Sequence, residues 1–307
     1  MSVVVRRCLG VRAGESVLVI GDPPSHELAT ALHAGALEAG AESVLAMMEE
    51  RASHGAEPPP PLAAALGSSD VFIAPTTKSL SHTAARKQAN EAGARGATLP
   101  GATAEMLSRV MAVDFDALRS RSRGLATLLD HASEARVTCA RGSDLRLDLS
   151  GRAGVPDDGD LTQPGAFGNL PCGEGFISPQ GGEGRLVASS LAALGLPSAP
   201  VALTVENGHL TGAAGDNGAR FLEMLTAHGH EGTNLAELGV GTNDRATLTG
   251  NVLEDEKILG SVHIAFGASA AFGGTVSVPV HLDCVVLDAS LELDGRRVLD
   301  AGRLLVE

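Results

Sequence analysis

The sequence predicts an α/β fold in the first part of the chain and an α+β fold in the second. Strand-like apolar runs alternate with helix-like segments over roughly the first third, which is typical of a parallel sheet. After about Arg136 the pattern changes to short strands and glycine-rich turns. We therefore expect an N-terminal parallel α/β layer, residues 1–125, followed by a largely antiparallel α+β domain, residues 126–307.

The expected elements of the first domain follow one another in a regular order. "ESVLVIGDPP" (15–24) has strand length and ends in turn residues, and "SHELATALHAGALEAGAE" (25–42) has helical spacing. The next segments predict a strand, a short helix after a proline loop, a strand and a helix: "SVLAMM", "PPPPLAAALGSSD", "VFIAPTT" and "SHTAARKQANEAGAR". "FDALRSRSRGLATLLDHASEA" (115–135) predicts a helix that leads into the second domain.

Two dipeptides mark hairpins in the second domain. Asn207-Gly208 and Asp294-Gly295 each stand between short strand-like runs. Both dipeptides favour the two-residue turn of a β-hairpin, because each central residue needs a positive φ. These turns indicate that the second domain is antiparallel.

Composition excludes several classes of protein. The chain of 307 residues holds 37 acidic and 23 basic residues, a formal charge of -14, and no basic cluster, so nucleic-acid binding is not expected. We expect no signal peptide and no membrane span. Four scattered cysteines without C-x-x-C spacing favour reduced thiols in a cytoplasmic protein.

The stretch "VPVHLDCVV" (278–286) places two polar residues in an apolar, strand-like run. Residues two apart on a strand share a face, so His281 and Asp283 point the same way. Burying both without partners is costly, and a metal ion would satisfy both.

Three other stretches carry polar residues in apolar or glycine-rich frames. "NLPCGEGFISP" contains Glu174, "LAELGVGTN" contains Glu237, and "EDEKILGSVHIAFG" contains His263. Taken singly, Glu237 is explained by a turn and His263 by a hydrogen-bonded core position. Together with His281 and Asp283 they are suited to one or two divalent ions, namely Zn, Mn, Co or Fe(II).

In this order the four segments resemble the signature segments of the aminopeptidase T and aminopeptidase S family of cocatalytic metallopeptidases. "GVRAGESVLVIGD" and "SLSHTAARKQANEAGARGATLPG" resemble its short bacterial members, so the resemblance spans most of the chain. It implies an α/β N-terminal domain, a metal-bearing C-terminal domain and a homodimer. It also implies that five residues bind two metal ions: Glu174, Glu237, His263, His281 and Asp283.

Two positions depart from the peptidase pattern. The family has tandem glutamates where this chain has Gly173 and Glu174, and a tyrosine where it has Ala270. The chain contains no tyrosine at all. Loss of a group that stabilises a tetrahedral intermediate commonly costs about 100-fold or more in rate.

A second relative with the same overall pattern is the non-haem iron enzyme 2,5-dihydroxypyridine 5,6-dioxygenase. It implies two histidines and one carboxylate on Fe(II), which His263, His281 and Asp283 would supply. Because Glu174 and Glu237 are both retained, we prefer a metal-dependent hydrolase, in which activated water attacks an amide or peptide bond of a small molecule or short peptide. The ring-cleaving dioxygenase is the alternative, and a non-catalytic binding or assembly protein is a third.

Other residues are candidates for roles in catalysis or substrate binding. In the hydrolase, Glu174 would shuttle the proton. "EDEK" (254–257) is interpreted as a solvated turn, with Lys257 a candidate contact for an anion. In "TTKSLSHT", Thr77, Ser79 and His82 lie at a predicted strand end and helix start, where exposed N–H groups would bind an anionic ligand. Ordinary N-capping is the competing explanation.

Overall fold

The structure, a computed structural model, describes residues 1–305, which form two compact units. The first unit comprises residues 1–112 and 159–172, and residues 113–158 and 173–305 form the second. The boundary predicted after residue 125 falls inside helix α5 (Phe115–His131), which lies wholly in the second unit. The chain returns to the first unit because β8 (Phe167–Asn169) pairs with β4 (Arg95–Thr98), a long-range pairing that short sequence patterns do not encode.

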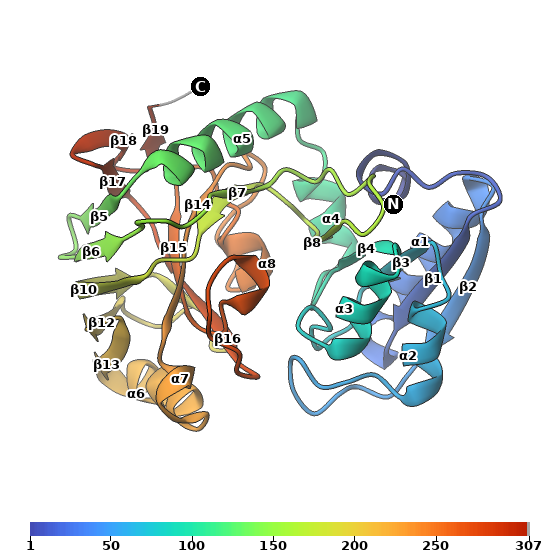
Figure 1. Cartoon of the computed structure of the whole chain (residues 1–307), viewed down its shortest axis with the longest axis horizontal. Coiled ribbons are helices and arrows are strands. Elements are labelled where there is room, and N and C mark those ends of the chain that lie inside the picture. Colours follow the sequence, from blue (N-terminus) through green and yellow to red (C-terminus); the bar gives the residue numbers. More distant parts are fainter. Residues whose placement is uncertain (306–307) are drawn as a thin grey trace. The chain divides into compact units, whose positions relative to one another are not determined.

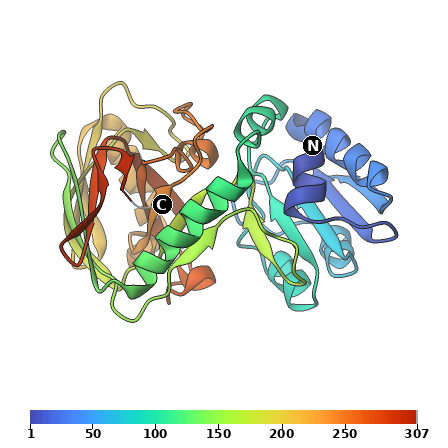
Figure 2. The same ribbon diagram turned by 90° about the horizontal axis from the view of Figure 1, so that it is seen from above.

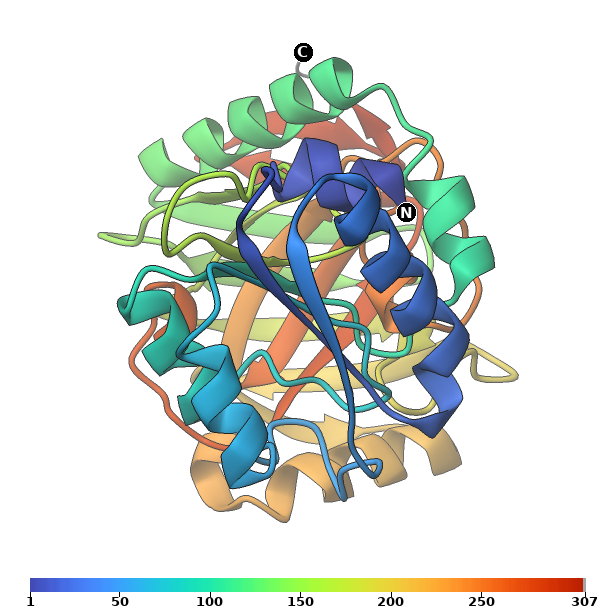
Figure 3. The ribbon, with the colours of Figure 1, turned by 90° about the vertical axis from the view of Figure 1, so that its right-hand side faces the viewer.

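The first unit is a parallel α/β layer, as the sequence predicts. Its sheet has the order β2-β1-β3-β4-β8, and every pair is parallel. Figure 3 shows α1 on one side of these strands and α2 and α3 on the other. The remaining elements are η1 (Val3–Cys8), β1 (Ser16–Gly21), η2 (Pro23–Ser25), α1 (His26–Glu38), β2 (Glu42–Met47), α2 (Pro60–Leu66), β3 (Val71–Ala74), α3 (Ala84–Glu91) and α4 (Ala104–Val110).

Apolar burial holds the helices of this unit on the sheet. The apolar stripe of α1 is fully buried at Leu32 and Ala36, while Leu37 remains exposed. Phe72 of β3 is buried in the cluster on the other face, among side chains of α2 and α3. Gly96 is required beside it, because a Cβ at that position would lie 2.5 Å from the Phe72 ring.

The second unit is built on two antiparallel sheets, with α5 along one side (Figures 1 and 2). The larger sheet has the order β13-β12-β10-β6-β5-β17-β18-β19, and the smaller has the order β11-β16-β15-β14-β9-β7. The strands of the larger sheet are β5 (Glu134–Cys139), β6 (Asp144–Asp148), β10 (Gly181–Ala188), β12 (Val201–Glu206), β13 (His209–Ala213), β17 (Ala289–Leu293), β18 (Arg296–Asp300) and β19 (Arg303–Leu304). Those of the smaller sheet are β7 (Val155–Asp157), β9 (Glu174–Ile177), β11 (Ser190–Leu191), β14 (Leu235–Gly241), β15 (Val262–Gly267) and β16 (His281–Val286).

One hydrophobic core joins the two sheets of this unit. Leu145 and Leu203 of the larger sheet share it with Leu238 and Ile264 of the smaller. Both predicted hairpin turns are confirmed, with positive φ at Asn207-Gly208 and at Asp294-Gly295. The other elements are α6 (Gly215–Thr226), α7 (Gly229–Gly232), α8 (Val252–Asp255) and η3 (Ala270–Phe272).

Candidate metal centre

Three neighbouring strands of the smaller sheet bring most of the predicted ligands together. The register of β14, β15 and β16 sets Ala265 opposite both Glu237 and Asp283, so the three share one face. His263 precedes Ala265 by two positions, and His281 precedes Asp283 by two, so both imidazoles point to that face as well. The other face of the same strands packs into the hydrophobic core. Strand alternation therefore turns four polar side chains away from the core.

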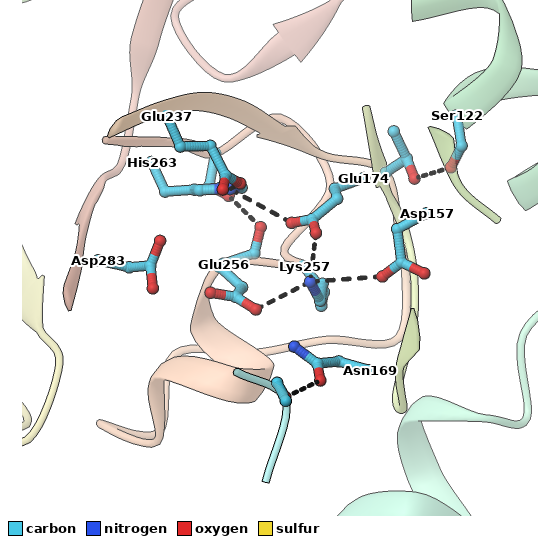
Figure 4. Close-up of polar contacts among 12 residues, drawn as sticks. Ser122, Asp157, Asn169, Glu174, Glu237, Glu256, Lys257, His263 and Asp283 are labelled. Carbon is cyan, nitrogen blue, oxygen red and sulfur yellow. Dashed lines mark hydrogen bonds and ion pairs between the residues drawn. The ribbon is translucent and has the colours of Figure 1, made fainter. Parts of the chain in front are cut away.

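His263 lies between two buried glutamates. Its Nε2 is 3.3 Å from Oε2 of Glu174 and 3.3 Å from Oε1 of Glu237. Glu174 comes from the start of β9, where it pairs with Gly241 of β14. One nitrogen or oxygen atom from each of His263, Glu174 and Glu237 lies within 4.8 Å of the others (Figure 4). Such a buried set of one imidazole and two carboxylates is suited to a divalent ion.

His281 connects the remaining predicted ligands to this group. Its Nε2 is 3.6 Å from Oε2 of Glu237 and 3.6 Å from Oδ1 of Asp283. Its Nδ1 lies 2.8 Å from the carbonyl oxygen of Ala268. Because a carbonyl only accepts, Nδ1 carries the hydrogen and Nε2 faces the carboxylates, the orientation that a metal ligand needs. The Glu237 carboxylate has one oxygen near each histidine, so contacts of 3.3–3.6 Å link the five predicted ligands one after another into a cluster. His281 and Asp283 lie outside the group of three whose atoms are all within 4.8 Å of one another.

The segment 254–257 is buried, so its interpretation as a solvated turn is wrong. Lys257 is 1% exposed, and its Nζ lies 2.6 Å from Oε1 of Glu174 and 2.8 Å from Oε1 of Glu256. A third carboxylate oxygen, Oδ2 of Asp157, is 3.4 Å away (Figure 4). Lys257 is therefore an internal counter-ion of the cluster, and its role as a contact for an anion stays a prediction.

Hydrogen bonds explain why this acidic segment folds inward. Glu254 accepts from the backbone N–H of Thr247 at 2.8 Å. Asp255 accepts from the N–H of Thr249 at 2.7 Å and from the hydroxyl of Ser190 at 2.6 Å. Buried carboxylates are tolerated when they accept hydrogen bonds. The hydrogen bonds from Thr247 and Thr249 attach the loop that precedes α8 to the helix. The end of α8 is thereby held in place, together with the residues that follow it.

Burial and mutual charge perturb the titrating groups of the cluster. Burial lowers the pKa of His263, but the carboxylates of Glu174 and Glu237 outweigh it and raise that pKa to about 9. At His281 burial again lowers the pKa, but the carboxylates of Asp283 and Glu237 outweigh it and raise that pKa to about 10. Burial raises the pKa of Glu174 to about 8, against the attraction of Lys257. The cluster thus has an excess of buried negative charge that attracts cations.

The donor set fits a divalent cation. One buried atom in it, Oε2 of Glu174, has no hydrogen-bond partner, although it lies 3.3 Å from Nε2 of His263. Orphaned buried polar atoms are rare and need an explanation such as an ion. Nitrogen and oxygen donors of this kind suit Zn, Mn, Co or Fe(II).

The predicted substrate-binding residues of "TTKSLSHT" lie in the first unit, near the carboxyl end of β3. The N–H of Thr77 donates to Oδ2 of Asp22 at 2.7 Å. The hydroxyl of Ser79 donates to that of Ser81 at 2.8 Å, and His82 is half-buried. A role of Thr77, Ser79 and His82 in substrate binding stays a prediction.

The start of α3, next to these residues, already has an anion from the protein. Thr83 caps the helix by accepting from the N–H of Arg86 at 3.3 Å. The carboxylate of Glu57 accepts from Ala84 at 2.5 Å and from Ala85 at 3.2 Å. These N–H groups therefore serve helix capping in this structure, which was the competing explanation.

Three residues of the site have no clear signal in the sequence. Asp157 lies in a loop-like "VPDDGD" segment, and Glu256 lies in the charged run that was read as solvated. Gly239, opposite His263 in the register, leaves room for the imidazole, since a Cβ there would lie 2.0 Å from Nε2. Only the "LGVG" spacing beside Glu237 hints that a small residue is needed at this point.

Comparison with known proteins identifies the family of the chain. The family NicX, 2,5-dihydroxypyridine 5,6-dioxygenase, matches residues 3–306. This chain belongs to that family. The 2,5-dihydroxypyridine 5,6-dioxygenase of Pseudomonas putida KT2440 is 27% identical over 256 residues, which cover 78% of this chain and 71% of the relative.

Two solved structures share the fold. The structure of the dihydroxypyridine dioxygenase from Pseudomonas putida KT2440 matches with a TM-score of 0.83 at 21% identity, over 98% of this chain and 94% of that one. Wild-type AmpT from Thermus thermophilus matches with a TM-score of 0.72 at 19% identity, over 99% and 98%. The predicted fold class is confirmed, and both relatives recognised in the sequence share it.

Membership of the NicX family revises the order of the predicted activities. It supports an enzyme, and it favours the dioxygenase, which was the alternative, over the hydrolase that was preferred. The likeness to AmpT supports the fold alone. Within residues 1–305, no helix has the length and apolarity needed to cross a membrane.

Proposed function

We propose that this protein is an Fe(II)-dependent dioxygenase that opens the ring of a dihydroxylated nitrogen heteroaromatic, with 2,5-dihydroxypyridine as the first substrate to test. The placement of His263, His281 and Asp283 on one face of two paired strands, with Glu237 beside both imidazoles, is the observation that carries the proposal. Two imidazoles and one carboxylate hold Fe(II) with open positions for a substrate and O₂. The family match supports the same chemistry.

The residues around this triad have distinct roles in the proposal. The carbonyl of Ala268 fixes the tautomer of His281, and Glu237 orients both imidazoles from a distance of 3.3–3.6 Å. Phe272 packs edge-on against His281 with ring centroids 5.5 Å apart, which gives the site an apolar wall suited to an aromatic ring. Oε2 of Glu174, which has no hydrogen-bond partner, accepts the proton of a substrate hydroxyl.

A metal-dependent hydrolase is the second candidate, and one observation favours it. One ligand atom from each of Glu174, Glu237 and His263 lies within 4.8 Å of the others, so the two glutamates could bind a further ion beside His263. Against it, the tyrosine of the peptidase pattern is replaced by Ala270, which is exposed at the start of η3. The dioxygenase needs no such phenol.

Oxygen uptake separates the candidates. Protein purified without oxygen and loaded with Fe(II) is mixed with 2,5-dihydroxypyridine, and O₂ consumption is measured beside loss of substrate absorbance. We expect one O₂ consumed per substrate, and no hydrolysis of aminoacyl-anilides by Zn-, Mn- or Co-loaded protein. Hydrolysis without O₂ uptake would overturn the dioxygenase, and a protein that binds no metal would support the non-catalytic alternative.

Matched variants test the ligands. We expect His281→Ala and Asp283→Asn to lose Fe(II) affinity and O₂ uptake together. His209→Ala is the control, because His209 lies in the same unit but packs against His230 outside the cluster. Equal loss in the control would show a general effect of histidine removal on the fold.

Two further expectations accompany this proposal. We propose that the protein acts as a homodimer on a small-molecule substrate in the cytoplasm. Light scattering coupled to gel filtration measures the oligomeric state, and a monomeric mass at micromolar concentration would contradict the dimer. The proposed substrate contacts of Thr77, Ser79 and His82 are tested by the effect of their alanine variants on KM.

A further inference from the structure

The buried ammonium of Lys257 is unusual for this chain. Lys257 is one of only three lysines, and the other two, Lys78 and Lys87, are each at least partly accessible to solvent. Lysine is almost never fully buried unless it is paired. Here the pairing is threefold, so the ammonium is part of a built arrangement of charges.

The carboxylates around Lys257 form the coordination set of a cation. Oxygens of Glu174, Glu256 and Asp157 lie 2.6, 2.8 and 3.4 Å from its Nζ. Three carboxylate oxygens around one point are the donors that divalent ions such as Mn²⁺ prefer. Without the ammonium, this set would be three buried carboxylates with no cation.

Glu174 connects this set to the proposed iron ligands. Its Oε1 contacts Lys257, and its Oε2 lies 3.3 Å from Nε2 of His263. In two-metal sites the ions lie about 3.5–4 Å apart and share a carboxylate of this kind. The ammonium therefore occupies the place next to the first ion where a second ion would be held.

The position of the ammonium is fixed by the fold. Lys257 lies two residues after the end of α8, and the carboxylates of Glu254 and Asp255 hold that helix to the loop beside it. Its side chain is enclosed, as Figure 4 shows for the carboxylates around Nζ. A free cation would have to displace a covalently tethered charge.

We propose that Lys257 is a built-in cation that limits the centre to one divalent ion by occupying the carboxylate set of a second. The inference rests on the proposed metal centre, and it adds a residue that decides the metal count. It also explains how Glu174 is retained in a protein that uses one ion.

Metal stoichiometry tests this proposal. Metal-free protein is dialysed against excess Mn(II), and bound Mn(II) is counted by elemental analysis and by its electron paramagnetic resonance signal. We expect one equivalent for the wild type, for Lys257→Arg and for the control Lys87→Met, and two equivalents with a spin-coupled signal for Lys257→Met. Methionine keeps most of the side-chain volume and removes the charge.

Three outcomes would overturn the proposal. The first is two equivalents of bound Mn(II) in the wild type, and the second is one equivalent of bound Mn(II) in a folded Lys257→Met protein. The third applies if Lys257→Met is unfolded without metal: excess Mn(II) then fails to refold it. Refolding by Mn(II) with two bound equivalents would support it, because the second ion then replaces the lost charge. A wild type that binds one Mn(II) but consumes no O₂ with Fe(II) would refute the dioxygenase and leave the role of Lys257 intact.

Discussion

Replacing Gly239 by alanine tests whether the position of the His263 ring determines metal binding. Gly239 of β14 lies directly opposite His263 of β15. A Cβ there would lie 2.0 Å from Nε2 and 2.2 Å from Cε1 of the imidazole. Non-bonded heavy atoms prefer about 3.5–4.0 Å, so the ring must move by more than an ångström from its place beside Glu174 and Glu237.

Gly239→Ala should lower both the stability of the protein and its affinity for the metal. Overpacking a buried site costs about 1–3 kcal/mol. In a domain of this size each kcal/mol lowers Tm by about 2–4 °C, so we expect the metal-free variant to melt about 2–12 °C lower. Loss of a residue that only orients a metal ligand weakens metal affinity about 10–100-fold. Displacing the ligand His263 itself should weaken the affinity about 100-fold or more.

The assay combines thermal unfolding of metal-free protein with calorimetric titration of Mn(II). The control is Gly212→Ala on β13, where a Cβ would be 3.5 Å from the nearest side-chain atom, an ordinary contact. We expect this variant to melt and bind Mn(II) like the wild type. A Gly239→Ala variant with wild-type Mn(II) affinity would refute the reasoning, because the displaced His263 would then not be a ligand.

Three further predictions concern stability. Glu57→Ala removes the acceptor for the first N–H groups of α3, including that of Ala84. The free energy of unfolding in urea should fall by about 0.5–2 kcal/mol in this variant, and by less in Glu57→Gln. Equal stability of the wild type and both variants would contradict the prediction. Burial raises the pKa of Glu15, and Arg95 and Arg12 together lower it by more, so Glu15 contributes stability that is present above about pH 4.3 and lost as the pH falls. The free energies of unfolding of wild type and Glu15→Gln should therefore converge as the pH falls below about 4.3, and a constant difference would count against these contacts. Free Fe(II) at 100 times Kd should stabilise the protein by about 2.7 kcal/mol. Removing the ion with a chelator under anaerobic conditions should therefore lower the melting temperature. A melting temperature that chelation leaves unchanged would argue against the metal centre.

The sequence alone is enough to predict most of the fold, because its evidence is local. Alternating strand and helix patterns around Ile20 and Leu32 depend on neighbours within one element, and the structure places β1 and α1 there. The turn at Asn207-Gly208 is likewise decided by the φ angles of two residues. The pairing of β8 with β4 is different, since some seventy residues separate the partners and no short pattern connects them.

The ligand cluster is an intermediate case. Spacing along one strand is sufficient to place His281 and Asp283 on one face, because alternation is a property of the strand itself. Bringing them to Glu237 and His263 requires the register of three strands, which the sequence shows only through resemblance to known families.

Only the tertiary structure decides the charge inside the cluster. The run "EDEK" has the composition of a solvated turn, and its burial depends on donors elsewhere in the chain, such as the hydroxyl of Ser190. Asp157 and Lys257 meet only because β7, β9 and the end of α8 pack together around Glu174. The sequence determines which residues can bind a metal, since that is a property of each side chain. How many ions they hold depends on which charges are neighbours in space, and folding determines that.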